Sequence, residues 1–310
     1  MIVTLTVNPS LDVATAAERV VHTRKLRCDQ PRREPGGGGI NVARAVRNLG
    51  GHALALYPAG GPNGRMLQDL VERDDLDHRP IPIAGHTRAN VTVLDRSNGD
   101  QFRFVMPGPE LSEDEQSRCL AEIEKLDPPP DFLVASGSLP PGVPDDFYRR
   151  VAEIGQRLGT RVVIDTSGPA LRNVARSGVY LLKPNLRELA ELTGRELRSE
   201  ADQNDAARAL VRDGFAEVAL VSLGAGGVLL ATDETTTRRR APTVRIRSRV
   251  GAGDSMVAGV VLALDRGESI AQAACWGVAA GTAAVMTPGT ELCRREDAER
   301  LFEQMQCERS

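Results

Sequence analysis

Short runs of apolar, mostly β-branched residues alternate with stretches of helical periodicity along most of this chain. No other feature constrains the fold as strongly, because such alternation builds a largely parallel sheet covered by helices on both faces. The sequence therefore predicts an α/β protein. The expected core strands are 2–7, 53–57, 132–135, 161–165, 180–182, 218–221 and 228–231. The expected helices are 40–49, 64–73, 112–126, 145–158, 186–192, 200–213, 253–264 and 269–286.

Two segments, 13–33 and 87–106, lack this helical period. The second contains Asn98-Gly99, and Asn-Gly is the strongest short signal for a β-hairpin. We expect both segments to form a small β-sheet lid outside the main sheet, where a lid could cover the strand ends; an edge extension of the main sheet is the alternative. The expected division is an α/β nucleotide- and substrate-binding domain at 1–12, 36–86 and 107–310, and the lid at 13–35 and 87–106.

A two-residue turn at Asn98-Gly99 would pair Leu94 with Arg103 and would give the hairpin one polar and one apolar face. The polar face would carry Arg88, Asn90, Thr92, Arg103 and Val105, and the apolar face Val91, Val93, Phe102 and Phe104. Such an apolar face must pack on something. We therefore predict a homodimer in which two lids pack by these faces and exchange cationic residues.

Composition excludes several classes of function. The chain has 310 residues, with 39 basic and 42 acidic ones, and only 3% aromatics. A near-neutral chain poor in aromatics is not expected to bind nucleic acid or a membrane surface. The uncharged stretch 269–290 is mostly Ala, Gly and Thr, so we expect a buried helix and no membrane span. The N-terminus has no signal-peptide pattern and the five cysteines form no Cys-x-x-Cys, which indicates a cytoplasmic protein.

The sharpest local motif is Val-Gly-Ala-Gly-Asp-Ser at 250–255, followed by an apolar helical run. Small residues at a helix start expose successive amides and form an anion site. An aspartate there is consistent with a base that takes a proton from a hydroxyl attacking a bound phosphoryl group. The alternative is that Asp254 is only a helix N-cap.

A run of four glycines, 36–39, precedes Ile40-Asn41 and another helix. It is neither a dinucleotide fingerprint nor a P-loop. It predicts a sugar-binding loop in which Asn41 holds hydroxyls, or alternatively a flexible hinge before a helix.

Two further motifs follow predicted strands. Asn185 and Glu188 are three residues apart at a helix start and could support Mg²⁺, although a helix cap with an acidic first turn is the alternative. The turn at 222–227, Ser-Leu-Gly-Ala-Gly-Gly, could wrap ATP phosphates or simply connect two strands.

Together these motifs resemble the ribokinase-like (PfkB) family of carbohydrate kinases over essentially the whole chain. The matching segments are 8–12, 25–28, 36–44, 103–108, 136–142, 183–188 and 251–254. Within the family, the chain is similar to the branch of minor-isozyme bacterial 6-phosphofructokinases. The resemblance implies a three-layer α/β/α fold with a lid, and a glycolytic kinase that uses ATP and Mg²⁺ to phosphorylate the 1-hydroxyl of fructose 6-phosphate. Tagatose 6-phosphate or fructose 1-phosphate kinases are the alternatives, and a non-catalytic sugar-phosphate sensor is a remote one.

The resemblance also implies residue roles. Asp254 would be the base, with the amides of Gly251, Ala252 and Gly253 stabilising the phosphoryl group. The sugar would be held by Asp12, Gly37, Gly38, Gly39, Asn41 and Ser138, and its phosphate by Lys25, Arg88 and Arg103. The ATP site would be lined by Lys183, Asn185, Ser222, Gly224, Gly227 and Thr282.

For metals, the resemblance implies Mg²⁺ at Asn185 and Glu188. A monovalent cation such as K⁺ would match Ser248, Val250, Ala284, Thr287, Gly289 and Glu291. Arg249 stands where the family commonly has a small residue, and its charge could repel that cation. The sequence therefore leaves both a K⁺-dependent and a K⁺-independent enzyme open.

Overall fold

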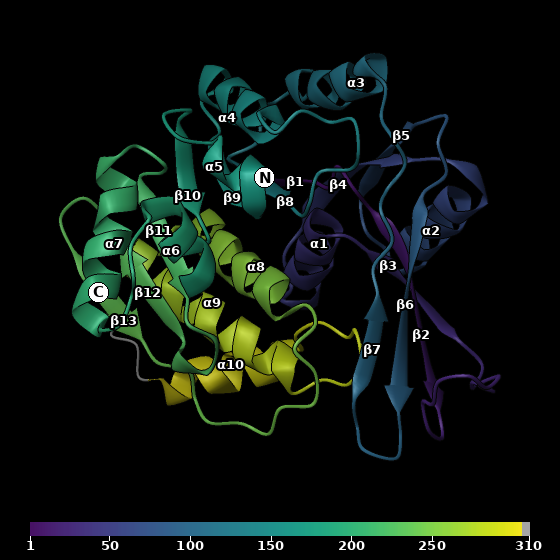
Figure 1. The fold of residues 1–310 in the computed structure, drawn as a ribbon. Helices are drawn as coiled ribbons and strands as arrows, with labels where there is room; N and C mark the ends of the chain where they lie inside the picture. The colour runs from purple at the N-terminus through teal and green to yellow at the C-terminus, as the bar shows by residue number, and fades with distance from the viewer. Residues whose placement is uncertain (306–310) are drawn as a thin grey trace.

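The computed structural model describes residues 1–305, and its body is built on one nine-stranded sheet (Figure 1). The strands are β1 (Ile2–Leu5), β4 (Ala53–Ala59), β5 (His78–Pro82), β8 (Phe132–Ser136), β9 (Arg161–Asp165), β10 (Val179–Leu182), β11 (Val218–Ser222), β12 (Val228–Ala231) and β13 (Thr236–Arg239). Their spatial order is β13-β12-β11-β10-β9-β8-β1-β4-β5. The strands from β11 to β5 run parallel, and β12 and β13 join one edge antiparallel.

Helices cover both faces of this sheet, which gives the three expected layers (Figure 1). One face carries α1 (Gly38–Asn48), α2 (Gly61–Arg73), α8 (Ala252–Asp265), α9 (Ile270–Val285) and α10 (Arg295–Gln304). The other carries α3 (Glu113–Glu124), α4 (Phe147–Leu158), α5 (Gly168–Arg172), α6 (Leu186–Thr193) and α7 (Glu200–Arg212). Ile2 packs in the first layer and its neighbour Val3 in the second, because successive strand side chains point to opposite faces.

All predicted core strands and helices are present, within a few residues at their ends. The sequence pattern did not indicate β5, β13, α5 or α10. β5 contains Pro80 and Pro82, which weaken a strand pattern and are tolerated here because β5 is an edge strand. Helix α9 is the uncharged stretch discussed above, and it packs between α8 and α10. Among residues 1–305, no helix is both long and apolar enough to cross a membrane.

The two segments without helical period lie in a separate four-stranded sheet, here called the lid sheet. It consists of β2 (Ser10–Ala17), β3 (Arg32–Gly36), β6 (Arg88–Asp95) and β7 (Gln101–Phe104), in the order β3-β2-β6-β7. The central strands β2 and β6 run parallel, and each outer strand is antiparallel to its neighbour. The expectation of a small sheet outside the main one is confirmed, and the alternative of an edge extension is wrong.

The register predicted for the β6–β7 hairpin is wrong by two residues. Leu94 pairs with Gln101 and Thr92 with Arg103. The loop is longer than a two-residue turn because the side chain of Asp95 hydrogen-bonds to it. The Oδ1 of Asp95 accepts from both the amide and the hydroxyl of Ser97, at 2.9 and 2.6 Å. A shift of two keeps every side chain on its predicted face.

Candidate active site

Helix α8 begins without a side-chain cap. Its N-cap is Gly251, with φ 75°, a left-handed conformation that glycine adopts without strain. The N-cap alternative for Asp254 is therefore wrong, since Asp254 is the third residue of the helix. Within residues 1–305, the amides of Ala252, Gly253 and Asp254 have no hydrogen-bond acceptor. These free amides and the helix dipole together make a binding place for an anion.

The glycine run forms the start of α1 and is closely packed, which rules out a flexible hinge. A Cβ on Gly38 would lie 2.3 Å from the Oγ of Ser136, and one on Gly39 would lie 2.7 Å from the carbonyl oxygen of Leu5. Gly37, the N-cap, has φ 115° and also lacks a side-chain cap. These glycines therefore let the first turn of α1 approach the ends of β1 and β8.

Helices α1 and α8 pack together, and one hydrogen bond joins their first turns. The Nδ2 of Asn41 donates to the Oδ2 of Asp254 at 2.9 Å. This bond fixes the carboxylate beside both uncapped helix starts. The structure thus brings together the base and the sugar-binding amide that the sequence predicted separately.

The surroundings of Asp254 tune its acidity. Burial, followed by the negative charge of Asp165, raises the pKa of Asp254 to about 6, against the lowering effect of Asn41 and Lys183. Lys183 is buried and its Nζ lies 3.0 Å from the Oδ1 of Asp165. Burial alone would lower the pKa of Lys183, but Asp165 and then Asp254 and Glu188 raise it above its ordinary value. A carboxylate with a pKa near neutrality is suited to general base catalysis.

Asp165 was not among the predicted site residues. It ends β9, and the carboxyl ends of neighbouring parallel strands meet at one edge of a sheet, where ligands bind in open α/β folds. An acidic residue at the end of a buried strand is the sequence signal that marks this position. Lys183, predicted for the ATP site, follows β10 at the same edge and lies close to Gly253.

Asn185 and Glu188 form a capping box at the start of α6. The Oδ1 of Asn185 accepts from the amide of Glu188 at 2.9 Å, and the Oε2 of Glu188 accepts from the amide of Asn185 at 2.8 Å. The capping alternative is thus correct. Burial raises the pKa of Glu188, although the hydrogen bond from the amide of Asn185 and the positive charge of Lys183 both lower it. Only the Oε1 oxygen of Glu188 remains without a described partner, so it is the atom that fits a metal or its bound water.

The predicted ATP-phosphate loop joins β11 to β12 through a short 3₁₀ turn at Gly224–Gly226. Ser222 lies beside the capping box, since its amide donates to the carbonyl of Pro184 at 2.9 Å. Gly227 has φ 88°, and a Cβ there would lie 2.0 Å from the carbonyl oxygen of Arg239. Thr282 is buried on α9. Across residues 1–305, no three His, Cys, Asp or Glu side chains gather as a metal cluster.

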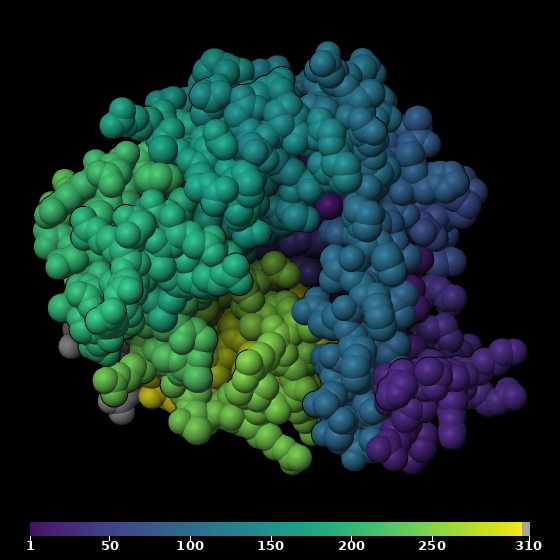
Figure 2. Space-filling view, in the orientation of Figure 1, coloured from purple at the N-terminus to yellow at the C-terminus, as the bar shows by residue number. Residues whose placement is uncertain are grey.

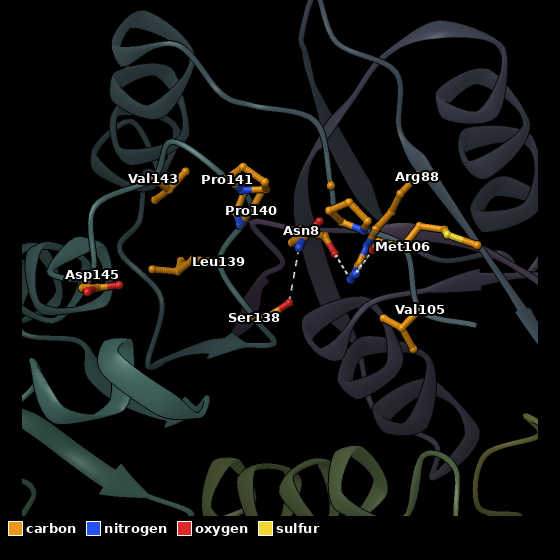
Figure 3. A pocket seen from close by; sticks show the side chains of 12 residues that line it. Asn8, Arg88, Val105, Met106, Ser138, Leu139, Pro140, Pro141, Val143 and Asp145 are labelled. Atoms are coloured by element: carbon orange, nitrogen blue, oxygen red, sulfur yellow. Dashed lines mark hydrogen bonds between the residues drawn. The ribbon is translucent and has the colours of Figure 1, made fainter. Parts of the chain in front are cut away.

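A cavity of about 430 Å³ opens between the lid sheet and the loop after β8. Figure 2 shows a hollow where the blue surface of the lid faces the teal part of the body, with green and yellow atoms below it. Arg88 and Asn8 lie on one side of the cavity, and the loop that contains Ser138 forms the other side (Figure 3). Arg88 donates to the carbonyls of Asn8 at 2.8 Å and Met106 at 2.9 Å and more weakly to Pro9 at 3.4 Å, which leaves further N–H donors for a ligand.

The structure brings only some predicted sugar-phosphate residues to this cavity. Arg88 and Ser138 line it, whereas Lys25 and Arg103 do not. Both of these cations are exposed and form no ion pair with any described residue. Asp12 lies on β2, opposite Asn90 of β6, and its carboxylate packs over Gly36.

The six positions expected for a monovalent cation lie in one cluster. The Oγ of Ser248 donates to the carbonyl of Gly289 at 2.5 Å and accepts from the amide of Val250 at 3.2 Å. The Oγ1 of Thr287 lies 2.7 Å from the carbonyls of both Ala284 and Glu291. These oxygens are of the kind that suits a hard cation. However, the hydroxyl of Ser248 already donates to the carbonyl of Gly289, and the one proton of the Thr287 hydroxyl is shared between the carbonyls of Ala284 and Glu291.

A partly buried carboxylate beside free helix-terminal amides, at the strand ends of an α/β sheet, is the arrangement of an enzyme that transfers a phosphoryl group to a hydroxyl. The chain belongs to the pfkB family of carbohydrate kinases, whose model matches residues 8–297. It is 48% identical over 302 residues to an ATP-dependent 6-phosphofructokinase isozyme 2 of Mycobacterium tuberculosis, covering 97% of this chain and 89% of the relative.

Solved structures of phosphofructokinase-2 from Escherichia coli share the fold, each covering 98% of both chains. The complex with fructose 6-phosphate has a TM-score of 0.92 at 39% identity. The complex with potassium has a TM-score of 0.94, and a tetrameric inhibited form has 0.92, both at 40% identity. The ribokinase-like fold predicted from the sequence is confirmed.

Proposed function

We propose that this protein is an ATP-dependent kinase that phosphorylates the 1-hydroxyl of fructose 6-phosphate to give fructose 1,6-bisphosphate. The observation that carries the proposal is Asp254, a carboxylate with a pKa of about 6 at the uncapped start of α8. The cavity with Arg88 provides positive charge for the phosphate that the sugar already carries. The relatives named as 6-phosphofructokinases support the same reaction.

In this mechanism, the Asp254 carboxylate takes the proton from the sugar hydroxyl. The oxygen then attacks the γ-phosphoryl group of ATP, and ADP leaves. The amides of Ala252 and Gly253 donate to the phosphoryl oxygens as negative charge builds on them. Asn41 holds the carboxylate in place. Mg²⁺, when bound with ATP, neutralises phosphate charge, and the Glu188 carboxylate with Asn185 would support it.

Lys183 is positioned to act on the same charge. Its ammonium group lies beside Gly253 and is held by Asp165, so it adds positive charge next to the free amides. Ser222, Gly224, Gly227 and Thr282 remain our candidates for ATP contacts.

The experiment is an assay of ADP release with fructose 6-phosphate, tagatose 6-phosphate, fructose 1-phosphate and fructose. We expect the highest kcat/KM with fructose 6-phosphate. A higher value with tagatose 6-phosphate or fructose 1-phosphate would reassign the substrate within the family. No ADP release with any of the four would contradict the proposal and favour a non-catalytic sensor.

We further propose that the chain divides functionally as expected, with 1–12, 36–86 and 107–310 binding substrates and 13–35 and 87–106 acting as a lid. Support comes from the lid sheet, which is hydrogen-bonded separately from the main sheet and carries Arg88 to the edge of the cavity. The described part of the substrate-binding domain ends at residue 305.

A homodimer through the lid is also proposed. Val91 pairs with Phe104 and Val93 with Phe102, so the predicted apolar face exists in one chain. Phe102 and Phe104 are 39% and 51% exposed, which is costly for a face left in water. The exposed Lys25 and Arg103 are then available to the cavity of a second subunit. Tetramer formation, as in the inhibited form of the E. coli relative, would be a further association step.

We place the protein in the cytoplasm, where its proposed substrates occur. Cys28, Cys119 and Cys293 are free thiols, which fits a reducing compartment. Cys275, which is disulfide-bonded, is the exception to this pattern.

A further inference from the structure

Asn90 uses both ends of its side-chain amide in the middle of the lid sheet. Its Nδ2 donates to the Oδ1 of Asp12 at 2.9 Å, and its Oδ1 accepts from the amide of Met106 at 3.1 Å. A donor at one end and an acceptor at the other fix the orientation of the amide. Asn90 therefore connects β2, β6 and the segment that forms one wall of the cavity.

Asp12 is held on one oxygen only. Its Oδ1 accepts from Asn90 and from the Oγ of Ser10, at 2.7 Å. Its carboxylate lies directly over Gly36, where a Cβ would come within 2.5 Å of it. The Oδ2 oxygen accepts from no described donor. One oxygen is thus fixed by the protein, and the other is left for a ligand.

Asp12 lies between the two ends of the proposed site. Arg88 stands two residues before Asn90 on β6, and Ser10 pairs with Arg88 as Asp12 pairs with Asn90. Gly36 leads through Gly37 into α1, which carries Asn41 and reaches Asp254. Burial lowers the pKa of Arg88, and the negative charge of Asp12 raises it. The same charge raises the pKa of Asp254, as burial and Asp165 do. The ring hydroxyls of a sugar bound between Arg88 and Asp254 therefore lie beside the free oxygen of Asp12.

We propose that Asn90 is a positioning residue for sugar recognition: it orients Asp12 so that Oδ2 accepts a hydrogen bond from one ring hydroxyl. This inference rests on the proposed function. An epimer with that hydroxyl on the other face would leave a partly buried carboxylate oxygen without a donor, and sites of this kind discriminate strongly. When Asn90 is lost, Asp12 turns more freely and the discrimination falls.

Substitutions at Asn90 and Ser10 test the bonds that hold Asp12. Asn90→Asp keeps an acceptor for the amide of Met106 but replaces the donor to Asp12 with a second negative charge. Asn90→Ala removes both bonds. Ser10→Ala removes the other donor to Asp12 and leaves Asn90 in place. Thr92→Ala is the matched control, because Thr92 is the next residue on the same face of β6 and its side chain has no described hydrogen bond.

The measurement is kcat and KM for fructose 6-phosphate, its C4 epimer tagatose 6-phosphate and its C3 epimer allulose 6-phosphate. We expect both Asn90 variants to raise KM for fructose 6-phosphate about tenfold, the usual effect of losing a hydrogen bond to a charged group, with KM for ATP unchanged. The kcat/KM preference over at least one epimer should fall about as much. Ser10→Ala should shift both quantities in the same direction, and Thr92→Ala should change neither.

An unchanged preference over both epimers in Asn90→Asp and Ser10→Ala would overturn the inference, as would equal losses of kcat for all sugars. If the Asn90 variants do not fold, Ser10→Ala decides by the same criteria. The wild-type enzyme separates this failure from that of the proposed function. An active wild type with unchanged variants contradicts only the role of Asn90, whereas a wild type that turns over none of these sugars overturns both.

Discussion

Asn41 of α1 donates to Asp254 of α8 across 2.9 Å, and this bond holds the proposed base in position and limits the rise of its pKa. Because the two residues start neighbouring uncapped helices, the carboxylate lies where two sets of free amides meet. The first two predictions depend on this pair.

Asp254→Asn should preserve sugar and ATP binding and should lower kcat by roughly 10²–10⁴, the range expected for a positioned general base. The amide keeps the size of the side chain but cannot accept the proton. Steady-state kinetics with binding by calorimetry measure both effects. Glu268→Gln, at an exposed acid after the same helix, is the control. A variant with near-normal kcat would disprove the role.

The pH dependence of kcat should show an acid limb with its midpoint near 6, because only ionised Asp254 can accept a proton. Activity is therefore lost as pH falls through that value. Asn41→Ala removes a hydrogen bond that lowers the pKa, so its midpoint should lie at higher pH. The control is Asn48→Ala, which removes another α1 amide that bonds to the carbonyl of Cys293 at 3.2 Å. Equal midpoints in Asn41→Ala and wild type would contradict this assignment.

Glu188→Gln should raise the Mg²⁺ concentration needed for half-maximal rate at fixed ATP, because it removes a negative charge near the metal. Glutamine can still serve in a capping box, so thermal stability should change little. Asp202→Asn makes the matched change in the capping box of α7 and should leave the titration unaltered. A midpoint shared by Glu188→Gln and wild type would limit Glu188 to its capping role.

Phe104→Asp should weaken the dimer and reduce activity, since it places a charge in the apolar face of the lid sheet. Sedimentation velocity at the assay concentration, with activity measured alongside, tests this. Met66→Asp, at a similarly exposed methionine on α2, should leave the assembly unchanged. A fully active monomeric wild type would refute the shared lid.

The rate should be the same in KCl and in choline chloride, because Ser248 and Thr287 already bond the carbonyls of the expected cation site. Arg249→Thr should increase the response to K⁺ by removing a positive charge beside those oxygens. Arg247→Thr, two residues away and also exposed, serves as the control. Strong K⁺ activation of the wild type would show that the cation displaces these hydroxyl bonds.

The sequence alone determined most of the strands and helices and singled out Asp254 as the candidate base. Hydrophobic periodicity is a local property, so strands such as β9 and β12 have their predicted bounds. The Gly-Ala-Gly-Asp motif is also local, since its amides and its carboxylate belong to one helix start.

Tertiary structure decided which side chains from distant segments meet. Asn41 and Asp254 are 213 residues apart, and Asp165 ends β9 whereas Lys183 follows β10. The bond from Asn90 to Asp12 needs β2 and β6 to pair in one register. The Asp95 side chain at the hairpin turn also joins distant segments, because its Oδ2 accepts from the amide of Val20 at 2.9 Å while its Oδ1 accepts from Ser97. Periodicity assigns a residue to a face, but strand order and register select its neighbours on that face, and they result from packing of the whole chain.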